Sequence, residues 1–131
     1  RLVKRLLGHW VEGSGAAYNP KRRQALELIR IVSTFEEVLA DWRKITAAEP
    51  LPVLTGASRD DGISFETCRG LMQKQPGLLV FGTGWGLAPE FFENGWHVLE
   101  PVRGVEDYNH LSVRAAAAII LDRLAGRSGN N

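Results

Sequence analysis

Residues 78–124 read LLVFGTGWGLAPEFFENGWHVLEPVRGVEDYNHLSVRAAAAIILDRL. An apolar run in this stretch ends in a glycine-rich loop, residues 82–86, and a second run ends at Glu100 and Pro101. A polar loop then leads into an alanine-rich segment typical of a helix, residues 111–125. Loops that follow neighbouring parallel strands can face one pocket, and such pockets hold nucleotide-like ligands. We therefore expect a ligand site built from these loops.

The rest of the chain alternates between helical and strand-like patterns. Apolar spacing predicts helices over residues 1–11, 21–27, 35–47, 63–73, 89–93 and 111–125. Short apolar or β-branched runs predict strands over residues 28–32, 51–55, 78–81 and 96–99, and the glycine-rich residues 12–20 predict a loop. This alternation predicts an α/β fold with a mainly parallel sheet flanked by helices.

The bulk composition indicates a globular domain. The chain has 131 residues, of which 44% are hydrophobic, so we expect one domain over residues 1–131 with a true core. Its first residues already resemble the middle of a helix, and we expect the domain to lack its N-terminal strand and helix segment. The longest apolar run has seven residues, 115–121, too few to span a membrane. Cys68 is the only cysteine, which fits a reducing, cytoplasmic compartment and no disulfide framework.

Charge is unevenly distributed along the chain. The net charge is +1, but residues 1–30 carry seven basic and two acidic side chains, whereas residues 60–107 carry three basic and eight acidic ones. Lys21, Arg22 and Arg23 form the densest basic run, and such a run can contact the phosphates of a nucleic acid. A solvated helix face explains the same residues equally well.

The loop over residues 82–86 places glycines at alternate positions, Gly82, Gly84 and Gly86. It is not a P-loop, because no Gly-Lys-Ser/Thr follows, and its third glycine comes one residue too early for the dinucleotide fingerprint. Glu100 follows Gly82 at the spacing of a ribose-binding acid, which keeps a nicotinamide-dependent oxidoreductase as an alternative. A tight turn with positive φ would also explain the glycines. Three of them after a strand further suggest bare backbone that a ligand can approach.

The loop before the final helix is the second candidate region. Asn109 is placed to cap that helix, with Ser112 in its first turn, although the same helix end could instead bind a polar ligand. His110 is the histidine best placed for proton transfer. No spacing of His, Cys, Asp or Glu resembles a metal site, and the serines lack the context of an activated nucleophile.

These motifs, in this order, resemble the paired cofactor loops of the SPOUT, or alpha/beta-knot, RNA methyltransferases. The matching segments are residues 82–87, 99–104 and 109–118, and HWVEGSGAAYNPKRRQAL is similar to an earlier loop of a bacterial subgroup. The resemblance implies a C-terminal trefoil knot that holds S-adenosylmethionine, a homodimer, and methyl transfer to a nucleotide of RNA, either tRNA or rRNA. A non-catalytic RNA-binding or assembly module on the same fold remains an alternative.

The resemblance also implies roles for individual residues. As cofactor-binding residues it implies Thr55, Gly56, Ala57, Gly82, Thr83, Gly84, Leu99, Pro101, Val102, Leu111 and Ser112. For catalysis, Asn109 could orient the target and His110 or Glu100 could take a proton, while Lys21, Arg22 and Arg23 could hold the RNA. Many family members carry a functional arginine after the first strand of the domain, and that strand is expected before Arg1. Arg103 or Arg114 could take its place.

Overall fold

The computed structural model describes residues 2–56, 58–105 and 110–126, and the chain forms two compact units, Arg1–Val38 and Leu39–Asn131. The division falls inside helix α4 (Phe35–Thr46). Thr34 and Glu37 stabilise the start of this helix: the Glu37 N–H donates to Thr34 Oγ1 (3.2 Å), and the Glu37 carboxylate accepts from the Ser33 N–H (3.2 Å).

The first unit is helical. It contains α1 (Leu2–Leu7), a π-helical turn η1 (Gly8–Glu12), α2 (Ser14–Tyr18) and α3 (Pro20–Glu27). The prediction of a loop over residues 12–20 was therefore wrong in part, because α2 lies within it. Asn19 begins α3 by accepting a hydrogen bond from the Arg22 N–H (3.1 Å), and Pro20 suits the first turn since it has no N–H to satisfy.

The predicted strand over residues 28–32 is not formed. In the described part of the chain, no strand pairs with this segment, and its apolar side chains lie in solvent, with Leu28 82% and Ile31 60% exposed. The β-preference of branched residues expresses packing against neighbouring strands more than a preference of the backbone itself. Without such a neighbour, the pattern does not produce a strand.

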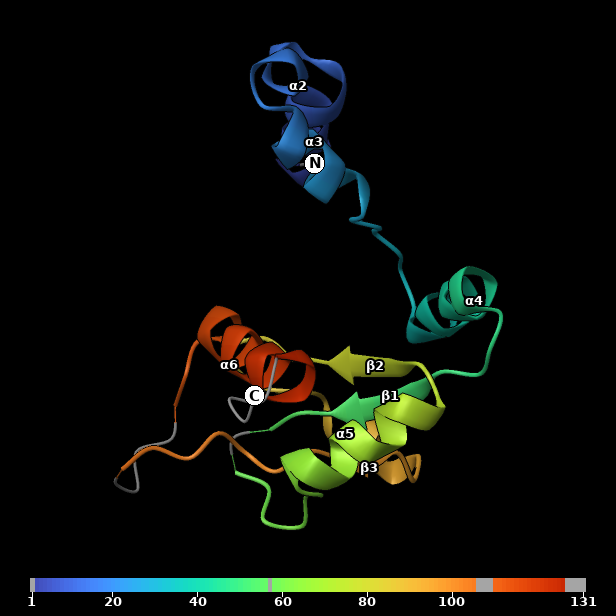
Figure 1. The fold of residues 1–131 in the computed structure, drawn as a ribbon, viewed down its shortest axis with the longest axis vertical. Coiled ribbons are helices and arrows are strands. Elements are labelled where there is room, and N and C mark those ends of the chain that lie inside the picture. Colours follow the sequence, from blue (N-terminus) through green and yellow to red (C-terminus); the bar gives the residue numbers. More distant parts are fainter. Residues whose placement is uncertain (1, 57, 106–109, 127–131) are drawn as a thin grey trace. The chain divides into compact units, whose positions relative to one another are not determined.

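The second unit contains a small parallel sheet, which confirms the expected α/β class. Strands β1 (Leu51–Leu54), β2 (Gly77–Val80) and β3 (His97–Val98) pair in parallel in the order β2-β1-β3. Figure 1 shows β1 and β2 side by side and pointing the same way. Helix α5 (Phe65–Lys74) connects β1 to β2, and a short 3-10 helix η2 (Pro89–Glu93) precedes β3. All three carboxyl ends therefore meet at one edge of the sheet.

The core of this unit joins the sheet to α5 and to the final helix α6 (Val113–Ala125). Its buried members are Val53, Cys68, Leu99, Ile120 and Leu124. The two helices also contact each other directly, since the Arg123 guanidinium lies 4.9 Å from the centre of the Phe65 ring. No helix among the described residues is long and apolar enough to cross a membrane.

Helix α6 begins later than predicted. Its N-cap is Ser112, whose hydroxyl accepts from the Ala115 N–H (3.1 Å), so the helix starts at Val113. The prediction that Asn109 caps this helix was wrong, and Asn109 itself lies outside the described residues. Gly126 is the C-cap that ends the helix, with its N–H donating to the Asp122 carbonyl (2.8 Å).

Candidate functional site

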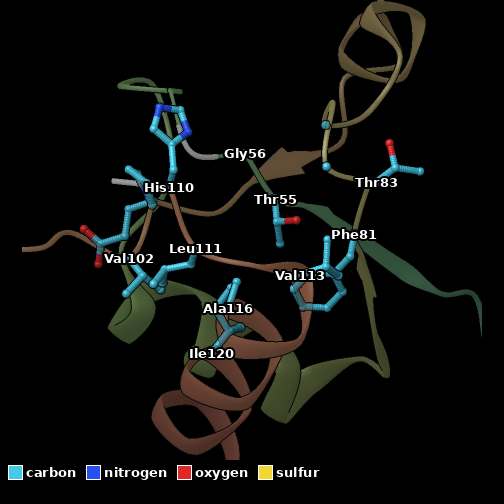
Figure 2. Close-up of a pocket in the computed structure, with 15 residues that line it drawn as sticks. Thr55, Gly56, Phe81, Thr83, Val102, His110, Leu111, Val113, Ala116 and Ile120 are labelled. Atoms are coloured by element: carbon cyan, nitrogen blue, oxygen red, sulfur yellow. The ribbon is translucent and has the colours of Figure 1, made fainter. Parts of the chain in front are cut away.

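A cavity lies at the carboxyl ends of the three strands. Its volume is about 150 Å³, roughly ten times what a single water molecule needs. Figure 2 shows Thr55 and Gly56 between two sides, with His110 and Val102 on one and Thr83 on the other. The full lining comprises Thr55, Gly56, Phe81, Gly82, Thr83, Gly84, Gly86, Glu100, Pro101, Val102, His110, Leu111, Val113, Ala116 and Ile120.

The segment after β1 supplies the middle of the lining. The Thr55 hydroxyl donates to the Val80 carbonyl (2.9 Å), and the Thr55 N–H donates to the same oxygen (3.2 Å). These bonds tie the end of β1 to the end of β2 and fix the Thr55 side chain at the cavity. The hydroxyl oxygen retains lone pairs that can accept a hydrogen bond from a ligand.

The loop after β2 is a tight turn. The Gly86 N–H donates to the Thr83 carbonyl (2.9 Å), and Gly86 has φ +81°, which favours glycine. A Cβ at Gly82 would lie 2.2 Å from the Gly86 carbonyl carbon, so that position excludes every side chain. Gly84 differs, because a Cβ there would meet nothing within 4 Å. The turn thus needs glycine at Gly82 and Gly86, while Gly84 keeps the lining bare.

The segment after β3 brings a carboxylate to the cavity. Glu100 Oε1 accepts a hydrogen bond from the Phe65 N–H (2.9 Å) at the start of α5. The Glu100 N–H donates to the Ile63 carbonyl (2.8 Å). A Cβ at Gly62 would lie 2.6 Å from the Glu100 nitrogen, so this close approach also depends on glycine. Both the backbone and the side chain of Glu100 are therefore fixed.

Helix α6 closes the cavity with apolar side chains. Figure 2 shows Ala116 and Ile120 on this helix, with Val113 near Phe81. The small Ala116 side chain lets the helix backbone approach the cavity. Apolar walls with a few fixed polar groups are the usual composition of a small-molecule site.

Most of the predicted site residues of this unit are brought together here. Those lining the cavity are Thr55, Gly56, Gly82, Thr83, Gly84, Glu100, Pro101, Val102, His110 and Leu111. Leu99 is instead buried in the core, and Ser112 caps α6. Ala57 and Asn109, predicted for cofactor binding and catalysis, lie outside the described residues.

Several lining residues were not among those given an individual cofactor-binding or catalytic role from the sequence. They are Phe81, Gly86, Val113, Ala116 and Ile120. Gly86 belongs to the alternating glycine pattern that predicted a ligand-accessible loop, although no individual role was assigned to it. The apolar members carry no such signal, because a side chain facing a cavity and one facing the core look alike in sequence.

The predicted RNA contacts lie in the first unit, on α3. The Arg22 guanidinium stacks over the Trp10 ring at 4.4 Å, and Arg23 Nε pairs with Glu27 Oε1 at 3.0 Å. Both arginine side chains are thus held by neighbours, and the Arg23 side chain is still 51% exposed. The described residues contain no group of three or more His, Cys, Asp or Glu that could hold a metal ion.

Comparison with known proteins identifies the family. A family model described as SAM-dependent RNA methyltransferase, where SAM is S-adenosylmethionine, matches residues 1–126. The chain belongs to this family. The expected relationship to S-adenosylmethionine-dependent RNA methyltransferases is thereby confirmed.

Individual relatives of the chain agree with the family match. A tRNA (guanine-N(1)-)-methyltransferase of Oleidesulfovibrio alaskensis is 45% identical over 96% of the chain, and one of Nitratidesulfovibrio vulgaris is 44% identical over 96%. An uncharacterized protein of Aquifex aeolicus is 38% identical over 97% of the chain. The chain spans 30% of the length of each of the first two relatives and 63% of the third.

Proposed function

We propose that this chain binds S-adenosylmethionine and takes part in methyl transfer to a nucleotide of tRNA. The observation that carries the proposal is the cavity at the carboxyl ends of three parallel strands, in a chain of the SAM-dependent RNA methyltransferase family. The choice of tRNA is supported by the two relatives that are tRNA methyltransferases.

The residues at the cavity fit this cofactor. Gly84 leaves open space where any other residue would place a Cβ, so backbone groups are accessible to a ligand. Phe81, Val113 and Ile120 offer an apolar surface to an adenine ring, while the Thr55 oxygen can accept a hydrogen bond from an amino or hydroxyl group. When bound, S-adenosylmethionine supplies an electrophilic methyl group.

Because that methyl group is reactive by itself, the protein mainly has to align it with its acceptor. We assign proton removal from the acceptor to Glu100 or His110, since both line the cavity. One Glu100 oxygen is already held, because it accepts a hydrogen bond from the Phe65 N–H. The second oxygen is the one we assign to the acceptor. Orientation of the target nucleotide is assigned to Asn109.

We assign binding of the RNA phosphate backbone to the basic residues 21–23 of the first unit. Contacts from Lys21, Arg22 and Arg23 to phosphates would add affinity without selecting a sequence. The stacking of Arg22 on Trp10 supports this assignment, because it holds a planar guanidinium in a defined orientation at low entropic cost.

We extend the proposal to the architecture that the resemblance implies, namely a trefoil knot around the cofactor and a homodimer in the cytoplasm. The support is the order of the motifs in residues 82–87, 99–104 and 109–118. A crystal structure of the intact protein with S-adenosylhomocysteine tests both features, and a monomer with an unthreaded α6 would refute them.

The function itself is tested with two measurements on the intact protein. S-adenosylhomocysteine is titrated calorimetrically, and labelled methyl transfer from S-adenosylmethionine to unmodified tRNA transcripts is counted. We expect saturable binding and incorporation of label. Binding of tRNA without incorporation would favour the non-catalytic RNA-binding module, and displacement by NADH would favour the nicotinamide enzyme.

A further inference from the structure

Trp85 stands out among the aromatic side chains of the second unit. It is 99% exposed, although both of its neighbours in the chain, Gly84 and Gly86, line the cavity. Its own side chain is not part of the lining, so the indole projects into solvent from the rim. A single exposed apolar residue is common on protein surfaces and needs no explanation. Its place on the cavity rim is what makes Trp85 informative.

The backbone that carries Trp85 is fixed. The Trp85 N–H donates to Thr83 Oγ1 (3.2 Å), and the Gly86 N–H closes the turn on the Thr83 carbonyl (2.9 Å). Gly82 packs tightly against the backbone of Gly86 and Leu87. The exposure of the indole is therefore imposed by a hydrogen-bonded turn, which holds the start of the side chain in place before any partner arrives.

Other aromatic side chains of this unit are engaged within the protein. Phe91 and Trp96 pack on each other with ring centres 6.4 Å apart, and the Arg59 guanidinium lies 4.4 Å from the centre of the Phe92 ring. Trp85 contrasts with them, because its near-complete exposure leaves the indole faces open to solvent.

The chemistry of an open indole at this rim fits an unstacked nucleobase. Proteins that recognise single-stranded RNA stack splayed-out bases on aromatic side chains, and the stacking contact is made with the face of the base rather than with a phosphate. This matters here, because residues 60–107 carry eight acidic and three basic side chains and would attract phosphates poorly. A base is the part of RNA that this rim can hold.

We propose that Trp85 is the stacking platform for an unstacked base of the RNA substrate, holding it at the mouth of the cavity. This inference rests on the proposed function, because it takes RNA as the substrate. It adds a recognition residue that selects a base displaced from its helix, while the cofactor is held by the residues that line the cavity.

The experiment compares Trp85→Leu with Trp85→Phe in the intact protein. Leucine keeps apolar bulk and removes the π-face, whereas phenylalanine keeps an aromatic face. Affinity for unmodified tRNA transcripts is measured by filter binding at one salt concentration, and S-adenosylhomocysteine affinity is measured by calorimetry. We expect Trp85→Leu to weaken tRNA binding about tenfold, or about 1.4 kcal/mol. Trp85→Phe is expected to stay within about threefold, and cofactor affinity to stay unchanged in both variants.

Three results would overturn the stacking role. They are wild-type tRNA affinity in Trp85→Leu, a parallel loss of S-adenosylhomocysteine affinity that would place the indole over the cofactor, and a loss of tRNA affinity that follows dissociation of a dimer on size exclusion. Failure of the wild-type protein to bind S-adenosylhomocysteine or transfer a methyl group would refute the proposed function instead. The tRNA affinities of the two variants would still decide the role of Trp85.

Discussion

At the scale of single residues, glycines of one turn meet different physical demands. Gly82 is required by the fold, because a side chain would collide with the Gly86 backbone, and Gly86 is required by its positive φ. Gly84 has an ordinary φ and free space around it. The fold therefore does not require glycine at this position, and we expect the open space beside Gly84 to be used by a ligand in the cavity.

Substitution of Gly84 separates ligand binding from folding. Gly84→Val adds a branched side chain at the cavity, and its Cβ would meet no protein atom within 4 Å, so we expect S-adenosylhomocysteine affinity to fall by about tenfold or more, at least 1.4 kcal/mol. The calorimetric titration is repeated for this variant, with circular dichroism to verify the fold. Gly70→Ala is the matched control, since that glycine also has free space for a Cβ but lies on α5 outside the cavity lining. Equal affinities in both variants would show that the ligand does not approach Gly84.

Glu100 offers a second test at this scale. Glu100→Gln retains an oxygen that can accept from the Phe65 N–H, so we expect the free energy of unfolding to change by less than about 0.5 kcal/mol. Loss of the carboxylate is expected to lower kcat for tRNA methylation about 10²-fold or more, because glutamine cannot take a proton. Single-turnover rates and urea unfolding measure the two effects. Full activity in Glu100→Gln would limit Glu100 to positioning α5, and Glu100→Ala should then lose stability without a change in the pH profile.

At the scale of elements, local hydrogen bonds determine where the helices begin. Ser64 caps α5 by accepting from the Thr67 N–H (3.0 Å), and Ser112 does the same for α6. For α5 the sequence predicted a start at residue 63, whereas Ser64 is the N-cap; for α6, Asn109 competed with Ser112 because Asn is an equally good cap. Propensity cannot choose between two caps three residues apart.

The cap of α6 gives the prediction for this scale. Ser112→Ala removes the acceptor of the Ala115 N–H, and we expect the free energy of unfolding to fall by about 1 kcal/mol. Chemical unfolding in urea measures the loss. Ser58→Ala is the control, because that serine lies in an exposed turn, where substitutions usually stay within about 0.5 kcal/mol. If the two variants were equally stable, the capping bond would contribute nothing.

At the scale of the whole molecule, one hydrophobic cluster of the second unit joins the sheet to helices α5 and α6. Cys68 on α5 lies in that core with Val53 of β1 and Ile120 of α6, and its side chain is fully buried. Burial raises the pKa of the Cys68 thiol above its ordinary value of 9.0, because the thiolate would lose its hydration. Ionisation of this thiol is thereby coupled to unfolding of the unit.

The coupling predicts how stability depends on pH. Above about pH 9, the unfolded chain releases the Cys68 proton while the folded chain keeps it, so the free energy of unfolding should fall as pH rises. Below about pH 9 both the folded and the unfolded chain hold the proton, so Cys68 causes no change of the free energy of unfolding with pH there. Urea unfolding at pH 8 and pH 10 measures the slope, and Cys68→Ala, though less stable overall, should show a shallower one. Identical slopes would show that other groups cause the entire dependence.

The strands of the second unit and the loops after them could be predicted from sequence, because both leave local signals. Apolar runs predicted β1, β2 and β3 within a few residues of their observed bounds. The segment over residues 28–32 carries the same signal and forms no strand, since no described strand pairs with it. A run of β-branched and apolar residues shows that a segment is able to form a strand. Whether it does so depends on a neighbouring strand to pair with, which the run itself does not identify.

The turns at the carboxyl ends of the strands can be predicted from the sequence, because glycines, helix caps and apolar runs act over only a few residues. The sequence thus sufficed to predict that the loop over residues 82–86 and the segment around Glu100 lie close together, and both line the cavity. Only the folded chain showed that Leu99 belongs to the core, that Ala116 and Ile120 of α6 belong to the cavity, and that Phe65 holds Glu100. These facts depend on which side of a packed layer each side chain faces. The facing of each side chain depends on contacts between segments that are distant in sequence. Phe65 and Glu100, for example, are 35 residues apart.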